Sequence, residues 1–175
     1  MGRRENDGTL RIMEAGQALS TAAQLALALA GFAGVVVVFR SGPLHQWRSL
    51  DKVRLQILLT NSILPLALCL VALLLLTIKP PPPWIWRACS GLAVAFVLLV
   101  APIMSKSVRA VPQDEFKGRS KFLFYFLSIL GIAILLLQVY NLIALNVFWA
   151  FFAVIIVQLL TGAVQFVRLI LLPEH

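Results

Sequence analysis

The sequence predicts an all-α integral membrane protein, a bundle of about five transmembrane helices. Hydrophobic residues make up 61% of the 175 residues and charged residues only 13%, about half the charged share of an average soluble domain. Uncharged runs extend over 15–39, 55–78, 88–105 and 122–167. Because about 20 apolar residues cross a ~30 Å hydrocarbon layer as a helix, the first three runs suit one crossing each and the last suits two. The strict alternation of a β-barrel strand is absent.

The elements follow in order from these runs. Residues 1–15 form a polar N-terminal tail, and residues 16–172 form the transmembrane domain. Its first span is expected at about 16–39, and the second, at about 50–78, follows the turn signal Ser41-Gly42-Pro43 and stops before four prolines, which cannot continue a helix. The third span is expected at about 84–104, the fourth at about 121–140 and the fifth at about 147–172, with a tight turn near 141–146 between the last two.

The distribution of basic residues predicts the orientation. With five crossings, ten of the fifteen Lys and Arg residues fall on the side that holds the C-terminus. The positive-inside rule then places the N-terminus outside and the C-terminus in the cytoplasm. Trp84, Trp86, Tyr140 and Trp149 fall at the expected outer interface, where aromatic rings are enriched.

Small residues recur every four positions in the first span. Ala18, Ala22, Ala26, Ala30 and Gly34 form this predicted ridge. Small side chains let two backbones approach closely, which favours helix association in lipid. The partner is either a helix of the same chain or another copy or membrane protein.

The second span carries Thr60-Asn61-Ser62 followed by Pro65. Proline has no N–H for the carbonyl of Asn61 four residues earlier, so a polar group is freed within the membrane. Broken helices with polar residues at depth line solute sites in transporters. The alternative is a simple kink whose carbonyl is satisfied by neighbouring groups.

The fifth span has a polar stripe. Gln158, Thr161, Gln165 and Arg168 fall within an arc of about 80° on a helix. Such a stripe avoids lipid and faces the bundle interior or water. It forms either interhelical hydrogen bonds or one wall of a cavity whose opposite wall would contain Gln56, Thr60 and Asn61.

Several chemistries have no support in the sequence. Asp51, in the first turn of the second span, is the one acidic residue within the predicted spans, and His45 and His175 lie in a loop and at the terminus, so no nucleophile at membrane depth has a base to activate it. Cys69 and Cys89 form no CxxC motif; we therefore expect no metal and no cofactor.

The net charge of +8 is accounted for by topology and anionic lipid headgroups, and no nucleic-acid-binding motif accompanies it. The headgroup contacts are expected from Lys106, Arg109, Lys117, Arg119 and Lys121.

The segment Leu29-Ala30-Gly31-Phe32-Ala33-Gly34-Val35-Val36, with Phe39-Arg40 after it, resembles the first helix of small multi-spanning membrane proteins of prokaryotes. In those proteins too, a Trp and a segment with Asp and Arg open the second helix, as Trp47, Asp51 and Arg54 do here. The resemblance covers about residues 20–60. It implies a multi-pass protein of a prokaryotic inner membrane and brings no activity, cofactor or site residue.

Two functions are consistent with these patterns. The first is a non-enzymatic scaffold or subunit that acts through helix packing and basic cytoplasmic loops, with the lipid bilayer and a second copy or another membrane protein as its partners. The alternative is a small oligomeric channel or transporter with a polar site lined by the second and fifth spans.

Overall fold

In the computed structural model, residues 2–39, 47–78, 80, 82–112 and 118–171 are described, and every regular element among them is helical. The helices are α1 (Gly2–Phe39), α2 (Ser49–Leu76), α3 (Ile85–Arg109), α4 (Gly118–Tyr140), the π-helical turn η3 (Asn141–Leu145) and α5 (Phe148–Leu171). Five stretches are long and apolar enough to cross a membrane: Ile12–Phe39, Ser49–Leu76, Ile85–Arg109, Tyr125–Leu145 and Phe148–Ile170. The predicted all-helical fold with five such helices is confirmed.

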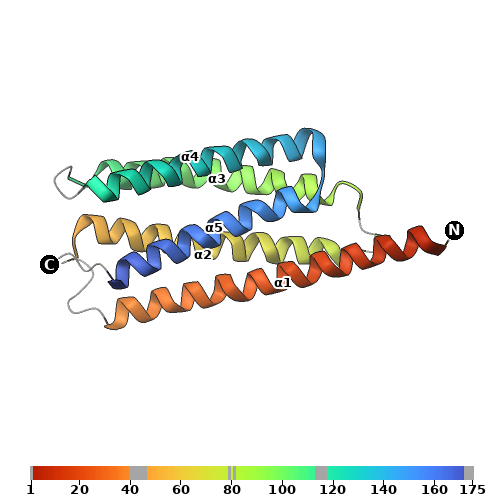
Figure 1. Ribbon diagram of the computed structural model, residues 1–175, viewed down its shortest axis with the longest axis horizontal. Helices are drawn as coiled ribbons and strands as arrows, with labels where there is room; N and C mark the ends of the chain where they lie inside the picture. The colour runs from red at the N-terminus through yellow and green to blue at the C-terminus, as the bar shows by residue number, and fades with distance from the viewer. Residues whose placement is uncertain (1, 40–46, 79, 81, 113–117, 172–175) are drawn as a thin grey trace.

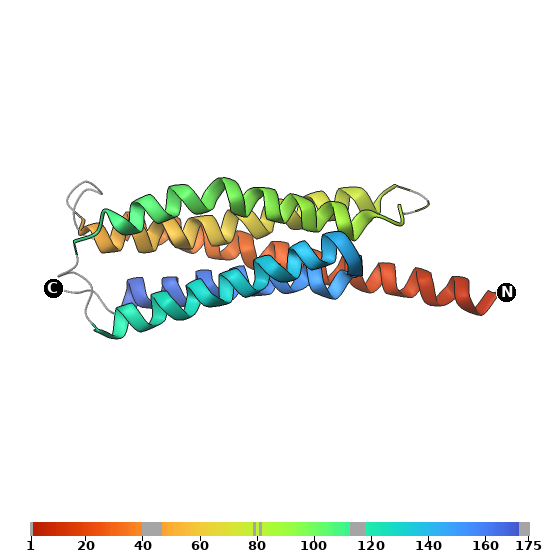
Figure 2. The ribbon, with the colours of Figure 1, turned by 90° about the horizontal axis from the view of Figure 1, so that it is seen from above.

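Consecutive helices run in opposite directions, so that α1 begins and α5 ends at opposite ends of the bundle (Figure 1). Helix α2 packs against α1, α3 and α5, whereas α4 packs against α3 and α5. The end at which α2 and α4 begin is called the basic end below, because Lys52, Lys106, Arg109 and Arg168 lie there. The first turns of α1 extend past the other helices at the far end (Figure 2).

Two element boundaries differ from those expected. The polar tail over 1–15 is not separate from the first span, since α1 is continuous from Gly2. Once a helix has formed, each further residue that joins it adds one backbone hydrogen bond, so the helix can extend beyond the apolar span. Residues 2–15 contain no proline that would stop this extension. Helix α3 likewise runs five residues past the predicted end at Met104, to Arg109, and contains Pro102.

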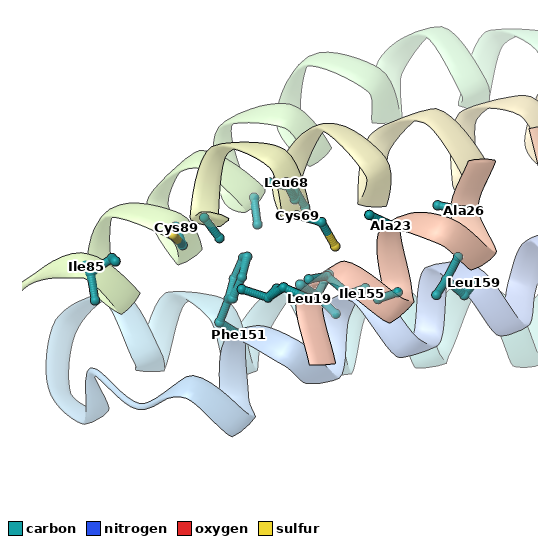
Figure 3. Packing of buried hydrophobic residues seen from close by; sticks show 14 residues of the cluster. Leu19, Ala23, Ala26, Leu68, Cys69, Ile85, Cys89, Phe151, Ile155 and Leu159 are labelled. Atoms are coloured by element: carbon teal, nitrogen blue, oxygen red, sulfur yellow. The ribbon is translucent and has the colours of Figure 1, made fainter. Parts of the chain in front are cut away.

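The main core lies in the half of the bundle away from the basic end. Leu19 and Ala26 of α1, Cys69 of α2, Cys89 of α3 and Phe151 of α5 are all at most 1% exposed and belong to one cluster. Their side chains converge from four helices in Figure 3. Small residues in this cluster permit close helix approach, which is the main source of association where lipid removes the hydrophobic drive between helices.

Helix α4 contributes an apolar outer face rather than core. Phe126, Ile129, Ile132 and Leu136 are each more than half exposed, and among the described side chains of this helix only Ile134 packs against the main core cluster. An apolar surface of this kind is stable next to acyl chains. At the basic end, Leu50 and Val53 of α2 pack with Val111, which follows α3, so the two helices are fixed side by side there.

Candidate functional site

Helix α2 stays helical through Pro65, which is buried. The two polar residues before it bond within their own helix: Asn61 Nδ2 donates to Ile57 O at 2.9 Å and Ser62 Oγ donates to Leu58 O at 2.8 Å. The carbonyl of Asn61, which Pro65 leaves without its helical donor, faces Gly162 of α5. A Cβ atom built on Gly162 would lie 3.6 Å from this oxygen and 3.7 Å from Asn61 Cβ. The absence of a side chain at Gly162 therefore lets α5 pass close to the break.

A cavity of about 360 Å³ lies between α2, α3, α4 and α5 and is called the inner pocket. Among the described residues that line it, the polar ones are Asn61, Ser128, Gln138, Gln158 and Thr161, and the others are apolar or glycine. Asn61 and Gln158, predicted to face each other across a cavity, thus line one shared space. None of the described residues that line this pocket is charged.

Gln158 has unused hydrogen-bonding capacity. The residue is only 8% exposed, and its buried Oε1 atom has no hydrogen-bond partner. Thr161, one turn further along α5, donates its hydroxyl proton to Val157 O at 2.8 Å. A buried acceptor without a donor costs about 1–3 kcal/mol, so a donor that enters the inner pocket would recover part of this free energy.

Gln56 and Thr60, expected on the same wall as Asn61, line a different space. They lie in a cavity of about 560 Å³ between α2 and α3, called the outer groove, which Asn61 does not line. The reason is helical geometry. Thr60 is one residue before Asn61, so its side chain points about 100° away from that of Asn61 around the helix. Gln56 is one helical turn before Thr60 and therefore lies on the same side as Thr60. Only Asn61 of the three reaches the inner pocket.

The remaining residues of the polar stripe, Gln165 and Arg168, are buried at 1% and 9% exposure but line neither cavity. Both amide atoms of Gln165 are buried without a hydrogen-bond partner. Near the same end, Arg54 of α2 forms a buried ion pair with Asp51 at 3.2 Å. The i, i+3 spacing of Asp51 and Arg54 was the available sequence signal for this pair.

A second polar network, which the sequence patterns did not predict, joins α3 to the turn between α4 and α5. Ser90 Oγ donates to Gln138 Oε1 at 2.9 Å and accepts from Asn141 Nδ2 at 2.7 Å. Gln138 Nε2 donates to Ala150 O at 2.7 Å, and Val147 N donates to Asn141 Oδ1 at 2.9 Å. Ser90, Gln138 and Asn141 are at most 1% exposed. The sequence did contain a signal for this network, because these three residues are polar groups in apolar runs and polar residues at membrane depth require partners.

Asn146 completes this turn. It has a positive φ of 51° and closes the π-helical turn with a bond from its N–H to Asn141 O at 3.0 Å. Its side chain accepts from Arg87 N at 3.1 Å and donates to Pro83 O at 2.6 Å. The start of α3 and the end of the α4–α5 connection are thereby fixed to each other.

The predicted ridge on α1 is only partly covered. Ala22 and Ala26 are buried, Ala18 and Ala30 are half-buried, and Gly34 is exposed. A step of four residues turns about 400°, so a four-residue repeat drifts about 40° per step around the helix. The covered stripe instead alternates steps of four and three over Ala15, Leu19, Ala22 and Ala26, and Ala33 follows seven residues later on the same side.

Among the predicted headgroup residues, Lys106 and Arg109 are exposed in the last turn of α3. Lys117 and the side chains of Arg119 and Lys121 lie outside the described residues. In the described part of the chain, no three His, Cys, Asp or Glu residues are grouped so that they could hold a metal ion.

The sequence matches no protein-family model, no curated protein and no solved structure. The fold and the pocket define the protein at the level of class: a multi-pass helical membrane protein with a partly polar pocket between α2, α3, α4 and α5.

Proposed function

We propose that this chain is a non-enzymatic membrane protein that binds a small neutral solute in the inner pocket, as a subunit of a small channel or transporter. The observation that carries the proposal is that Asn61 of α2 and Gln158 and Thr161 of α5 line one cavity. Of the two functions that the sequence allowed, a shared pocket supports transport rather than packing alone.

The lining of the pocket indicates the chemistry of the solute. Gln158 Oε1 lacks a donor, and the Thr161 hydroxyl has already donated its proton, so both residues offer acceptor oxygens. A molecule with O–H or N–H groups would satisfy them. Because none of the described lining residues is charged, an ion would meet no counter-charge among them, which is strongly unfavourable away from water. A neutral polyol or amide fits these conditions.

The size of the inner pocket bears on how transport would occur. The pocket, about 360 Å³, is at the small end of the range for ligand sites and does not by itself amount to a path across a bilayer. We propose that several copies assemble to complete the path. We also propose a prokaryotic inner membrane as its location and a cytoplasmic basic end, on the resemblance of residues 20–60 and on the positive-inside rule.

Solute flux through reconstituted vesicles tests the proposal. The entry of glycerol and urea is followed by stopped-flow light scattering, and wild-type protein is expected to raise the permeability to at least one of them above that of empty vesicles. Asn61→Leu and Gln158→Leu should return it to the background. The matched control is Gln165→Leu, because Gln165 is a buried glutamine of the same helix that does not line the pocket.

The control variant should keep its flux, and all variants should elute as folded protein in size-exclusion chromatography. Flux that is unchanged in both Asn61→Leu and Gln158→Leu would remove the inner pocket from the function. Equal loss in Gln165→Leu would show that any polar-to-apolar change in α5 disturbs the bundle, and the proposal would then fail.

A second candidate function, a packing subunit, is favoured by the outer face of α1. A Cβ atom added at Gly31 or Gly34 would meet nothing within 4 Å, and the neighbouring Phe32 and Val35 are about half exposed. Another helix could approach this face closely. Gly31→Leu and Gly34→Leu would then dissociate an oligomer without changing the melting temperature of the monomer.

A further inference from the structure

The outer groove, at about 560 Å³, is larger than the inner pocket, and the proposed function does not use it. It runs along α2 and is closed on one side by Phe96 and Val100 of α3. Ile63 on its wall is 56% exposed, so the groove is open to the surroundings of the bundle. In a helix that spans a membrane, those surroundings are lipid.

The described polar residues that line the groove lie at its basic end. Lys52, Gln56 and Thr60 occupy successive turns of α2 there, beside Leu55 and Leu59, and Ile63, Leu64 and Ala67 continue the groove into the membrane. By the helical rise, the polar part extends over about 12 Å and the apolar part over about 10 Å more. A single cation at one end followed by neutral polar groups and then apolar side chains matches the order of groups in an amphiphile with an anionic head.

We propose that the outer groove is a binding site for one anionic phospholipid of the surrounding bilayer. The Lys52 ammonium binds the phosphate, and the Gln56 amide, about 6 Å deeper, donates to the ester carbonyl region. One acyl chain lies along Ile63, Ala67 and Phe96. Lys52 already interacts within the chain, and an ammonium group with three donors can serve a phosphate in addition.

The charge around the mouth of the groove favours this occupant over a neutral lipid. Lys106 and Arg109, both exposed, lie in the last turn of α3, and the packing of Val111 against Leu50 and Val53 holds that end of α3 beside the start of α2. Basic residues at the end of a transmembrane helix attract anionic headgroups. The site is separate from the inner pocket, so it stands or falls independently of solute transport.

Native mass spectrometry of the full-length protein tests the proposal. The protein in detergent is mixed with phosphatidylglycerol or phosphatidylcholine of identical acyl chains. We expect wild-type protein to retain one phosphatidylglycerol in preference to phosphatidylcholine, and Lys52→Gln to lower this preference about five-fold, which corresponds to about 1 kcal/mol. Lys106→Gln removes the same charge from a residue that does not line the groove and should lower the preference less than Lys52→Gln does.

The acyl-chain part of the site is tested separately. Ala67→Trp fills the apolar end of the groove and should lower the retention of both lipids while leaving the wild-type inner-pocket flux unchanged. A phosphatidylglycerol with a photoactivatable group in mid-chain should label peptides that contain Ile63, Ala67 or Phe96. Thermal melting in detergent shows that each variant is folded.

Two results would overturn the proposal. If Lys52→Gln and Lys106→Gln lower the lipid preference equally, the attraction is a general property of the basic end rather than of the groove. If Ala67→Trp retains lipid like the wild-type protein, or if labelling falls on α4 or α5 instead, the acyl chain does not occupy the groove.

Discussion

Two buried serines provide a sharp test of how this bundle is held together. Ser62 of α2 and Ser90 of α3 are both 0% exposed, but their hydroxyls have different partners. Ser62 bonds only the Leu58 carbonyl of its own helix, whereas Ser90 bonds Gln138 and Asn141 of the α4–α5 region. Ser90→Ala should therefore destabilise the protein, and Ser62→Ala should not.

The magnitude follows from the two interhelical bonds that Ser90→Ala removes. Interhelical hydrogen bonds in membrane proteins contribute about 0.6 kcal/mol on average and up to about 1.7 kcal/mol. The loss of two such bonds, with Gln138 Oε1 left without its donor, is expected to lower the free energy of unfolding by about 1–3 kcal/mol. The Leu58 carbonyl keeps its helical donor when the Ser62 hydroxyl is removed, so Ser62→Ala should change the free energy by less than about 0.5 kcal/mol.

Reversible unfolding in mixed micelles, followed by circular dichroism, measures both values. A double variant, Ser90→Ala with Gln138→Leu, should be less destabilised than the sum of the two single variants, since they share one bond. Equal effects of Ser62→Ala and Ser90→Ala would refute the reasoning, because they would show that the network around Ser90 contributes nothing beyond the bonds within a helix.

Two further predictions concern the basic end. Arg54→Met removes a partner of the buried Asp51 carboxylate and should lower the free energy of unfolding by about 3 kcal/mol, whereas Arg54→Met combined with Asp51→Leu should recover most of this loss in the same unfolding assay; a double variant as unstable as the single one would contradict this. Reporter fusions should place the C-terminus in the cytoplasm and the N-terminus outside, as the excess of Lys and Arg at the basic end requires, and two termini on the same side would be incompatible with five crossings.

The division of the predicted polar residues between two cavities has a simple geometric cause. The arc occupied by Gln158, Thr161, Gln165 and Arg168 follows from 100° per residue, and the structure buries or half-buries all four. The angle per residue does not show which neighbouring helix packs against that arc. Asn61 faces α5 through Gly162, whereas Gln56 and Thr60 line the groove beside α3, because the rotation of α2 is set by packing against three helices.

The polar network at the α4–α5 turn shows a different limit. Ser90 is 48 residues from Gln138 and 51 from Asn141, and no local pattern connects them. Each residue, taken alone, is a polar group in an apolar run and only requires some partner. Which partner it finds depends on the order in which helices lie side by side.

The number of spans and their approximate positions were already determined by the amino-acid sequence, because charged groups are excluded from the hydrocarbon layer and a helix needs about 20 residues to cross it. Solvation acts on each segment separately, so it can be read along the chain. The division of polar residues between the inner pocket and the outer groove, and the burial of Arg54 with Asp51, were decided only by the tertiary structure. These features depend on helix rotation and neighbour order, which result from side-chain packing between segments far apart in sequence.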